Sequence, residues 1–286
     1  MSILPVRELV HPTTGQTFKL GRQRPISHCR SLHLKNYLMR SYAPPPAAVN
    51  WVTAAKPSLN LIYLNDTLGD CVIAWGAHME GILTGNATGV PILYTEDQIK
   101  REYRIIGGYD GTPQSDQGCD EVTALNFWQQ NGFAGGTKIA GWMRVNGADP
   151  TEVRAAIDLF GTITFGVELP NAWCSNMPSA SGFSWDTAGT PDPNNGHCFG
   201  GCGYVSGQIN ISTWGMTGWI TDAAVAEYTA NSDGGELYTV LSMDWLSKVT
   251  EKSPVHVIVG CAAAEDVLFP ILMRFTKVAA VAVYAP

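Results

Sequence analysis

The sequence predicts an α+β protein, with helices concentrated in its first half and strands in its second. Helix signals fall at about residues 71–83, 120–131 and 150–160, where apolar residues recur at helical spacing. From Thr162 the pattern changes to short apolar runs bounded by Gly, Pro and Asn, which is typical of strands. This segregation along the chain favours two lobes, one helical and one built on a sheet.

Length and composition indicate a folded protein with a large core. Of the 286 residues, 45% are hydrophobic and 15% are charged, a balance that excludes intrinsic disorder. The net charge is −7 and the sequence has no basic run, so we expect no nucleic-acid partner. No apolar stretch reaches the roughly 18 residues of a membrane span, and the N-terminus has no apolar signal core. We therefore expect no membrane span and no Sec export.

The first predicted helix starts at Cys71, directly after the turn-forming stretch Asn65–Asp70. Nearly every residue of its first three turns is apolar or small, which is typical of a buried helix. The second helix ends at Asn131 before Gly132, and the third starts near Pro150, a residue suited to the first helical position.

Strand patterns dominate the second half of the chain. They fall at Thr162–Leu169, Cys198–Val205, Ile209–Trp214, Leu237–Leu241, Val255–Val259 and Val278–Tyr284, with a short helix from about Met243. Between the first two strands, Asn171–Gly196 is rich in Ser, Gly, Pro and Asn and predicts a long loop that ends at His197. Residues 1 to about 60, which include Pro44-Pro45-Pro46, predict an irregular lead-in.

Cys71 is a candidate nucleophile because of its place at the first turn of a helix. The helix dipole and the free N–H groups there favour the thiolate, and the same N–H groups can hold an oxyanion. An amide side chain just upstream, Asn65, can supply a second donor. The partner histidine of such a cysteine lies far away in sequence, and His197 is our candidate for the general base.

Five short motifs occur in order between Val49 and Trp219. They are Val49-Asn50-Trp51, Asn65 to Trp75, Gly118-Cys119-Asp120, Gly196-His197 with Gly203-Tyr204, and Ser212-Thr213-Trp214-Gly215 with Trp219. Together they resemble the papain and cathepsin family of cysteine peptidases. The resemblance implies a papain-like two-lobe fold, with a helical lobe, a β-barrel-like lobe and the cleft between them.

The resemblance also implies roles for individual residues. Cys71 is expected to be the nucleophile, His197 the general base and Asn65 an oxyanion donor. The residues expected to bind substrate are Gly118, Cys119, Asp120, Gly196 and Trp214, the last of which would cover His197. No cofactor is implied. A zinc site on His197, Cys198 and Cys202 would lack a fourth ligand, so we expect no metal.

The sequence departs from the family pattern at several of these positions. Position 68 is leucine, so the cysteine that would pair with Cys119 in a cleft disulfide is missing. The residue that orients the histidine is Asn in the family, whereas here the candidates are Ser212 and Asn210. Asp70 precedes the nucleophile, where a carboxylate would oppose the thiolate. The start of the nucleophile motif is also similar to papain-like proteins encoded in bacteriophage genomes.

These observations predict a division of the chain and two possible functions. Residues 1–48 form an arm or prosegment, residues 49–253 the papain-like domain and residues 254–286 an extension, with the helical lobe at about 60–150 and the β lobe at about 160–253. The first function is hydrolysis of amide bonds in a protein, a peptide or a peptidoglycan cross-link. The alternative is an inactive fold that serves as a structural or binding component of a virus particle, with virion assembly partners. A cytoplasmic or virion-associated location fits both.

Overall fold

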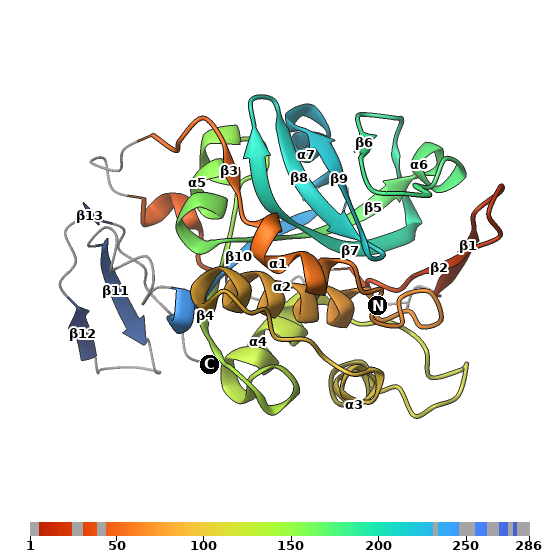
Figure 1. The fold of residues 1–286 in the computed structure, drawn as a ribbon, viewed down its shortest axis with the longest axis horizontal. Coiled ribbons are helices and arrows are strands. Elements are labelled where there is room, and N and C mark those ends of the chain that lie inside the picture. Colours follow the sequence, from red (N-terminus) through yellow and green to blue (C-terminus); the bar gives the residue numbers. More distant parts are fainter. Residues whose placement is uncertain are drawn as a thin grey trace.

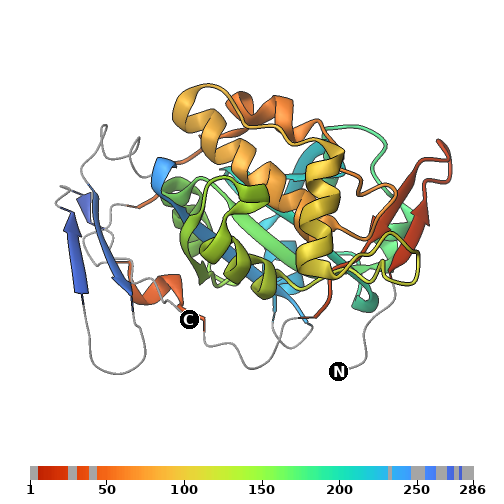
Figure 2. The ribbon, with the colours of Figure 1, turned by 90° about the horizontal axis from the view of Figure 1, so that it is seen from below.

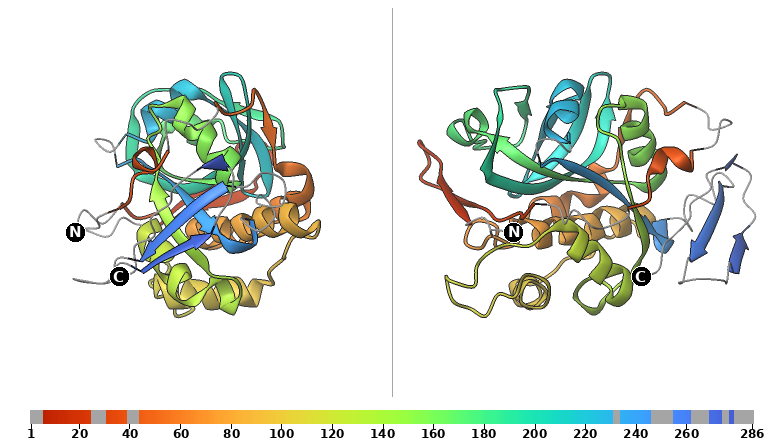
Figure 3. Two further views of the ribbon diagram at one scale, coloured as in Figure 1. Left: turned by 90° about the vertical axis from the view of Figure 1, so that its left-hand side faces the viewer. Right: turned by 180° about the vertical axis from the view of Figure 1, so that it is seen from behind.

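The helices of the first half and the strands of the second form two layers, which confirms the α+β class (Figure 1). The computed structural model describes residues 6–24, 31–38, 44–230, 234–245, 255–261, 269–273 and 277–278. Both views of Figure 3 place the sheet in the upper part of the molecule and most of the helices in the lower part.

The helical lobe is built around one long buried helix. Its helices are α1 (Val52–Leu59), α2 (Cys71–Thr88), α3 (Glu96–Gly107), α4 (Glu121–Asn131) and the short η2 (Phe133–Gly135). The first fifteen residues of α2 are all buried, so this helix is covered on every side rather than amphipathic. It ends at Gly89, whose φ of 85° supplies the left-handed C-cap. Seen from below, α2, α3 and α4 cover the sheet (Figure 2).

The β lobe is an eight-stranded sheet with mainly antiparallel pairing. Its order is β4 (Ile139–Arg144), β10 (Glu236–Ser242), β5 (Ile163–Pro170), β7 (Pro191–Val205), β8 (Gln208–Thr213), β9 (Met216–Thr221) and β6 (Phe183–Trp185), with β3 (Val49–Asn50) paired to β7. The helices of this half of the chain are α5 (Pro150–Phe160), α6 (Asn171–Ser175) and α7 (Asp222–Tyr228). All eight residues of β5 are buried because β7 and β10 flank the strand.

Each lobe has its own hydrophobic core, and β7 lies between the two cores. Alternate side chains of a strand point to opposite faces, so Cys198 and Cys202 belong to the helical core whereas Phe199 belongs to the β core. Trp75 of α2 crosses this boundary, since its indole nitrogen donates to Thr164 Oγ1 of β5 at 2.9 Å. Gly200 leaves room for the same indole, because a Cβ there would lie 1.7 Å from it.

Two parts of the chain that the sequence predicts to be irregular are ordered. The lead-in contains the hairpin of β1 (Arg7–Val10) and β2 (Thr17–Leu20), the short helix η1 (Leu34–Asn36), β3 and α1. The predicted loop of residues 171–196 contains α6 and β6, and β7 already begins at Pro191. Both predictions were wrong. In the loop of residues 171–196, tertiary pairing overrides turn-rich local composition, since β6 pairs with β9 and the start of β7 pairs with β5. In the lead-in, β1 and β2 form a local antiparallel hairpin and β3 pairs with β7.

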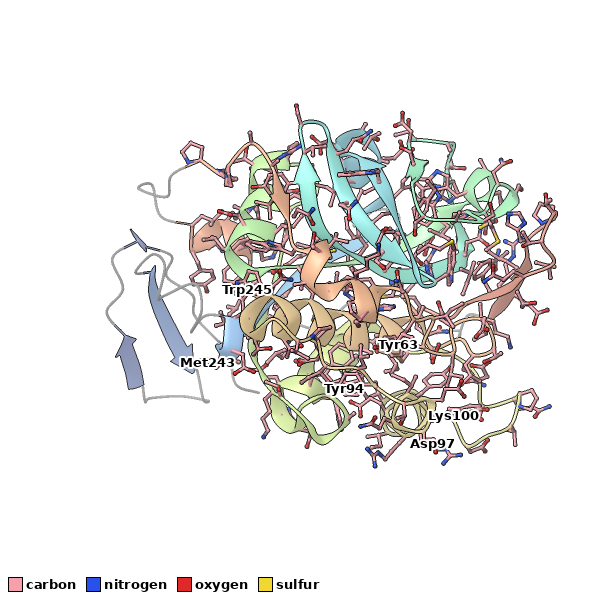
Figure 4. The ribbon with its side chains drawn as sticks, in the orientation of Figure 1. Tyr63, Tyr94, Asp97, Lys100, Met243 and Trp245 are labelled. Atoms are coloured by element: carbon pink, nitrogen blue, oxygen red, sulfur yellow. The ribbon has the colours of Figure 1, made fainter. Side chains whose placement is uncertain are left out.

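A three-stranded sheet stands beside the main body at the left of Figure 1. It contains β11 (Val255–Cys261), β12 (Phe269–Met273) and β13 (Lys277–Val278). The strand predicted at 255–259 corresponds to β11, whereas most of the strand predicted at 278–284 lies outside the described residues. The predicted helix from Met243 is described only as far as Trp245, whose labelled side chain lies near one end of α2 in Figure 4. Within the described residues, no helix is long and apolar enough to cross a membrane.

Candidate active site

Cys71 is the first residue of α2, as the sequence predicts. Its side chain is 1% exposed. Burial raises the pKa of the thiol to about 12, although polar backbone groups of Gly21 and Cys198 act to lower it. The thiol is therefore neutral at pH 7 in this state, because desolvation outweighs the favourable position at the helix start.

Asp70 precedes Cys71 in the sequence and is fully buried. Neither of its carboxylate oxygens has a hydrogen-bond partner among the described residues. Burial, with a further contribution from the nearby Asp116, raises the pKa of Asp70 well above its usual value. Asp116 itself accepts from the Gly69 amide and the Tyr103 hydroxyl. The environment therefore favours a protonated Asp70, which removes much of the charge that would oppose a thiolate at Cys71.

His197 lies on β7, and its imidazole packs against the core of the β lobe. It stacks on Trp214 with ring centroids 4.4 Å apart, and its Nε2 forms a hydrogen bond of 2.8 Å with Thr213 Oγ1. Nδ1 has no hydrogen-bond partner in the part of the chain that the structure describes. Burial lowers the pKa of His197 to about 3, so the ring is neutral at pH 7. The structure gives no hydrogen bond between this ring and Cys71.

The hydroxyl beside His197 belongs to Thr213, whereas the residues predicted to orient the histidine are Ser212 and Asn210. The two candidates for that role have other surroundings. Ser212 Oγ is buried without a hydrogen-bond partner among the described residues, and Asn210 lines a separate pocket of about 430 Å³ beside Val49 and Trp219. Adjacent residues of a strand face opposite sides, so only one of the neighbouring hydroxyl residues Ser212 and Thr213 can face His197. The sequence shows this pair of hydroxyl residues but does not show which of the two faces the histidine.

A small cavity remains between the two lobes at this point. Its volume is about 10 Å³, the size of one water-sized sphere. Its lining includes Cys71 and Asn65 from the helical side and Ser212, Thr213 and Trp214 from the β side. Trp214 is held in the left-handed region with φ of 50°, which few non-glycine residues adopt. The strained turn after β8 thus places the indole against His197.

Residues 17–24, which we call the cleft segment, pass beside Cys71, and the backbone of Gly21 interacts with its thiol. The main chain of the cleft segment forms hydrogen bonds with both lobes. On the β side, the Arg22 amide donates to the Gly196 carbonyl at 3.0 Å. On the helical side, the Gln23 amide donates to the Cys119 carbonyl at 3.0 Å, and the Gly21 carbonyl accepts from the Cys119 amide at 3.2 Å. The cleft segment is therefore an extended peptide that bridges the lobes.

Gly21 is the point of closest approach between the cleft segment and the nucleophile turn. A Cβ at Gly21 would lie 1.9 Å from the carbonyl oxygen of Gly69, two residues before Cys71. On the other side, a Cβ at Gly118 would lie 1.5 Å from the Gly21 oxygen. Only a glycine fits at either position without displacing backbone atoms.

Asn65 binds a carbonyl group of this same segment. Its Nδ2 donates to Lys19 O at 3.1 Å and to Leu68 O at 3.2 Å, while its own carbonyl accepts from the Lys19 amide at 2.9 Å. Asn65 thus pairs with the cleft segment through both its main chain and its side chain.

Of the residues predicted to bind substrate, Gly118, Cys119 and Gly196 contact the cleft segment through their main chain. Asp120 instead caps α4, since its Oδ1 accepts from the Thr123 amide at 2.9 Å. Trp214 covers His197. Gly21 and Arg22 are not among the predicted site residues, because nothing in a single sequence indicates that an N-terminal stretch returns to Cys71.

The cysteines whose side chains the structure describes are all free: Cys71, Cys119, Cys174, Cys198 and Cys202. Within the described ranges, no group of three or more His, Cys, Asp or Glu residues is arranged to hold a metal ion. The chemistry that this site offers is that of a thiol, an imidazole and main-chain donors.

Neither a protein-family model nor a curated protein matches the sequence. Solved structures do match. Xylellain, a cysteine protease from Xylella fastidiosa, superposes with a TM-score of 0.55 at 15% identity, over 78% of this chain and 96% of xylellain. The proform of Amb a 11, a cysteine protease and ragweed pollen allergen, has a TM-score of 0.53 at 15% identity, over 75% of this chain and 72% of that chain. This chain has the papain-like fold.

A further structure with the same papain-like fold is procathepsin L 3 from the larval midgut of Tenebrio molitor. Its TM-score is 0.53 at 13% identity, and the match covers 74% of this chain and 75% of that chain. At these identities the similarity establishes the fold alone. The papain-like architecture predicted from the sequence motifs is therefore confirmed, and the activity rests on the site.

Proposed function

We propose that the protein is a papain-like cysteine peptidase and that the described state is its latent form. The observation that carries this proposal is the peptide in the cleft. The main chain of the cleft segment pairs with Cys119 of the helical lobe and Gly196 of the β lobe beside Cys71. A groove that holds an extended main chain from both sides, with a thiol next to it, suits hydrolysis of amide bonds.

Latency follows from the charge states of the two reacting groups. In this state the pKa of Cys71 is raised to about 12 and the pKa of His197 is lowered to about 3, both by burial. A thiolate paired with an imidazolium cannot form under these conditions. Exit of the cleft segment would admit water, reverse both shifts and free the imidazole to approach Cys71.

In the open state, His197 Nδ1 takes the proton of the Cys71 thiol, because Nε2 is already bonded to Thr213. The sulfur attacks the carbonyl carbon of the substrate amide. The C–N bond then breaks, the amine leaves with the proton from His197, and the acyl group stays on the sulfur as a thioester. Water, deprotonated by His197, hydrolyses the thioester and restores the thiol.

The oxyanion of this reaction would accept hydrogen bonds from the first amides of α2 and from Asn65. Helix N-termini leave such amides unpaired within the helix. The Asn65 Nδ2 donor that now binds the Lys19 carbonyl becomes available when the cleft segment leaves. Its present use on a peptide carbonyl supports this role.

Residues 1–48 act as an inhibitory prosegment in this proposal, because the cleft segment lies within them. Activation by self-cleavage would occur near Pro44–Asn50, ahead of the papain-like domain. Intact-mass analysis during incubation at mildly acidic pH tests this, with Cys71→Ser as the control. Cleavage in the wild type and not in Cys71→Ser supports the prosegment. The substrate is a protein, a peptide or a peptidoglycan cross-link.

The test of the function itself is labelling with a peptidyl epoxide, read by peptide mass mapping on the full chain. Gly21→Ala, which displaces the cleft segment from Gly69, is the background for the comparison. We expect selective modification of Cys71 in this variant and its loss when His197→Ala is added. Modification that ignores His197, or that spreads over the other cysteines, contradicts the proposal.

An inactive papain-like fold in a virus particle is the second candidate. The observation that favours it is the position of His197, whose ring is stacked in the β core with Nδ1 unpartnered among the described residues. Absence of Cys71 labelling in a folded Gly21→Ala variant supports this alternative. Assembly partners would then be sought by reconstitution with virion proteins.

A further inference from the structure

The side chain of Arg22 lies in a buried pocket whose polar walls are acidic. Arg22 is 2% exposed as a residue and its side chain is fully buried. Its Nη2 donates to Glu236 Oε1 at 2.5 Å and to the Gly234 carbonyl at 2.8 Å, and its Nε lies 3.7 Å from Glu121 Oε1. Glu236 is fixed in turn by the Tyr238 hydroxyl, which donates to Oε2 at 2.6 Å.

Three elements build this pocket, and a glycine gives it depth. Glu121 begins α4, Glu236 begins β10, and Gly166 lies on β5 between them. A Cβ at Gly166 would lie 2.6 Å from Arg22 Nε and 2.3 Å from Glu121 Oε1. The missing side chain at Gly166 therefore leaves the volume that the guanidinium fills.

The arginine reaches the pocket from the cleft. Gly21, the residue before it, contacts the nucleophile turn, while the Arg22 amide binds Gly196. The pocket is thus one residue away from the position beside Cys71, on the path of an extended peptide. A substrate that lies in the cleft as the cleft segment does would present a side chain to the same pocket.

Arg22 does not satisfy the pocket completely. Both carboxylate oxygens of Glu121, whose side chain is 1% exposed, lack a hydrogen-bond partner among the described residues. Nε and Nη1 of Arg22 also lack one. Burial and the neighbouring Glu236 raise the pKa of Glu121 well above its usual value, and a buried carboxyl group without a hydrogen bond is costly. A guanidinium group that reaches Glu121 more closely than Arg22 does would supply that hydrogen bond.

A second basic residue of the cleft segment meets a second buried carboxylate. Arg24 contacts Glu168 with both nitrogens of its fork, Nε to Oε1 at 2.6 Å and Nη2 to Oε2 at 3.2 Å. Glu168 is 2% exposed and lies on β5, two residues after Gly166. The spacing of the two arginines thus matches two carboxylate sites along one wall.

We propose that the cleft selects peptides by an arginine that enters the pocket of Glu121 and Glu236, with a further basic residue two positions later at Glu168. This specificity rests on the proposed peptidase function, which it deepens by naming the substrate class. Planar guanidinium groups suit such sites because they bind carboxylates in a bidentate manner.

Binding of a synthetic peptide tests this without catalysis. The peptide has the sequence of residues 17–24, and its control carries the Arg22→Gln change. The protein is the full chain with Cys71→Ala, Gly21→Ala and Arg22→Gln, in which the cleft segment is displaced from Gly69 and the pocket lacks its own arginine. Removing one member of a buried charge pair costs about 2–5 kcal/mol. We therefore expect the arginine peptide to bind at least about 30-fold more tightly.

Two further variants make the test specific. Adding Glu236→Gln should reduce the preference for the arginine peptide over its control to less than about fivefold, which corresponds to about 1 kcal/mol. The exposed control Glu227→Gln should leave this preference unchanged. If Arg22→Gln does not fold, the same ratio is measured in the Gly21→Ala background, which keeps Arg22. Equal affinity of the two peptides, or no binding of either to folded protein, overturns the inference. Arginine-dependent binding, together with no His197-dependent labelling of Cys71 by the epoxide in the Gly21→Ala protein, would instead refute only the peptidase.

Discussion

The indole of Trp214 stacks on the imidazole of His197, with ring centroids 4.4 Å apart and planes 21° apart. Trp214 also contacts Phe18 of β2, at a centroid distance of 5.0 Å. The N-terminal hairpin therefore packs on the residue that covers the candidate general base. Through this contact the cleft segment joins the hydrophobic core of the β lobe beside His197.

The cleft segment is held by side chains at both of its ends and by main chain in the middle. Phe18 is fully buried against Trp214, and Arg22 is fully buried against Glu236. Between them, Gly21 has no side chain and lies against Gly69. Gly21 brings the main chain close to Cys71, while Phe18 and Arg22 hold the cleft segment against the two lobes.

Gly21→Ala should expose Cys71. The added Cβ meets the Gly69 carbonyl oxygen at 1.9 Å, a backbone contact that cannot yield cheaply. Overpacking of this kind costs about 1–3 kcal/mol, which raises the population of the open cleft by roughly 5- to 150-fold. The rate of Cys71 alkylation by iodoacetamide, followed by mass spectrometry, should rise by the same factor. Thr13→Ala, an exposed change in the same hairpin, should leave the rate unchanged.

Thr213→Val should destabilise the protein by about 1–3 kcal/mol, because it leaves His197 Nε2 buried without its hydrogen bond. Thr213→Ser keeps the hydroxyl and should therefore retain most of the wild-type stability. Urea unfolding monitored by tryptophan fluorescence gives both values. In the Gly21→Ala background, Thr213→Val should also slow epoxide labelling of Cys71, with rescue by Thr213→Ser.

Matched changes at the other two candidates separate the three residues. Ser212→Ala and Asn210→Ala remove two buried oxygens, Ser212 Oγ and Asn210 Oδ1, that have no hydrogen-bond partner among the described residues. We expect neither change to slow labelling of Cys71 as Thr213→Val does. A larger effect of Ser212→Ala or Asn210→Ala would return the orienting role to that residue.

The nucleophile helix illustrates what the sequence could predict. Turn residues at Asn65–Asp70 followed by an apolar run place the helix start at Cys71, and α2 begins there. The helices at α4 and α5 follow equally local signals, since Asp120 and Asp149 both cap with their side chains. Neighbouring residues determine where these helices begin, so the helix starts can be predicted from a single sequence.

The contacts of the cleft segment could not be predicted in the same way. Arg22 pairs with Glu236, more than two hundred residues later, and no local pattern records such a partner. For the same reason the strand from Pro191 was mistaken for a loop, because its pairing with Pro170 is tertiary. The choice of Thr213 over Ser212 depends on which face of β8 meets His197, and the motif alone leaves that open.

Glu80 should make stability depend on pH. This residue of α2 is 2% exposed, and burial raises its pKa from 4.5 to about 8, with a smaller contribution from Asp244. Between pH 4.5 and pH 8 the folded state therefore holds a proton on Glu80 that the unfolded chain has lost. The contribution of protonated Glu80 to the free energy of unfolding is full below pH 4.5 and is lost as the pH rises through 8. The free energy of unfolding of Glu80→Gln, taken relative to that of wild type, should rise by about 2–5 kcal/mol between pH 4 and pH 9.

Urea unfolding of both proteins at the two pH values checks this expectation. Asp97→Asn is the control, because Asp97 is an exposed carboxylate on α3, labelled in Figure 4. Its effect should stay within about 0.5 kcal/mol at either pH. A difference between Glu80→Gln and wild type that is the same at pH 4 and pH 9 would show that Glu80 ionises normally in the folded protein.

Phe18→Ala should release the cleft segment without unfolding the two lobes. Truncation of a buried phenylalanine costs about 3–5 kcal/mol, and we expect the cleft segment to open locally instead of passing this cost to the whole fold. Hydrogen exchange should therefore accelerate at the amides of Lys19, Arg22 and Gln23, which bond to the lobes, while the amide of Val240 in β10 stays protected. Val10→Ala, an exposed change in the same hairpin, should leave all four amides protected. Equal acceleration at Val240 would mean that the segment and the lobes form one cooperative unit, in which case release of the segment could not serve as the activating step.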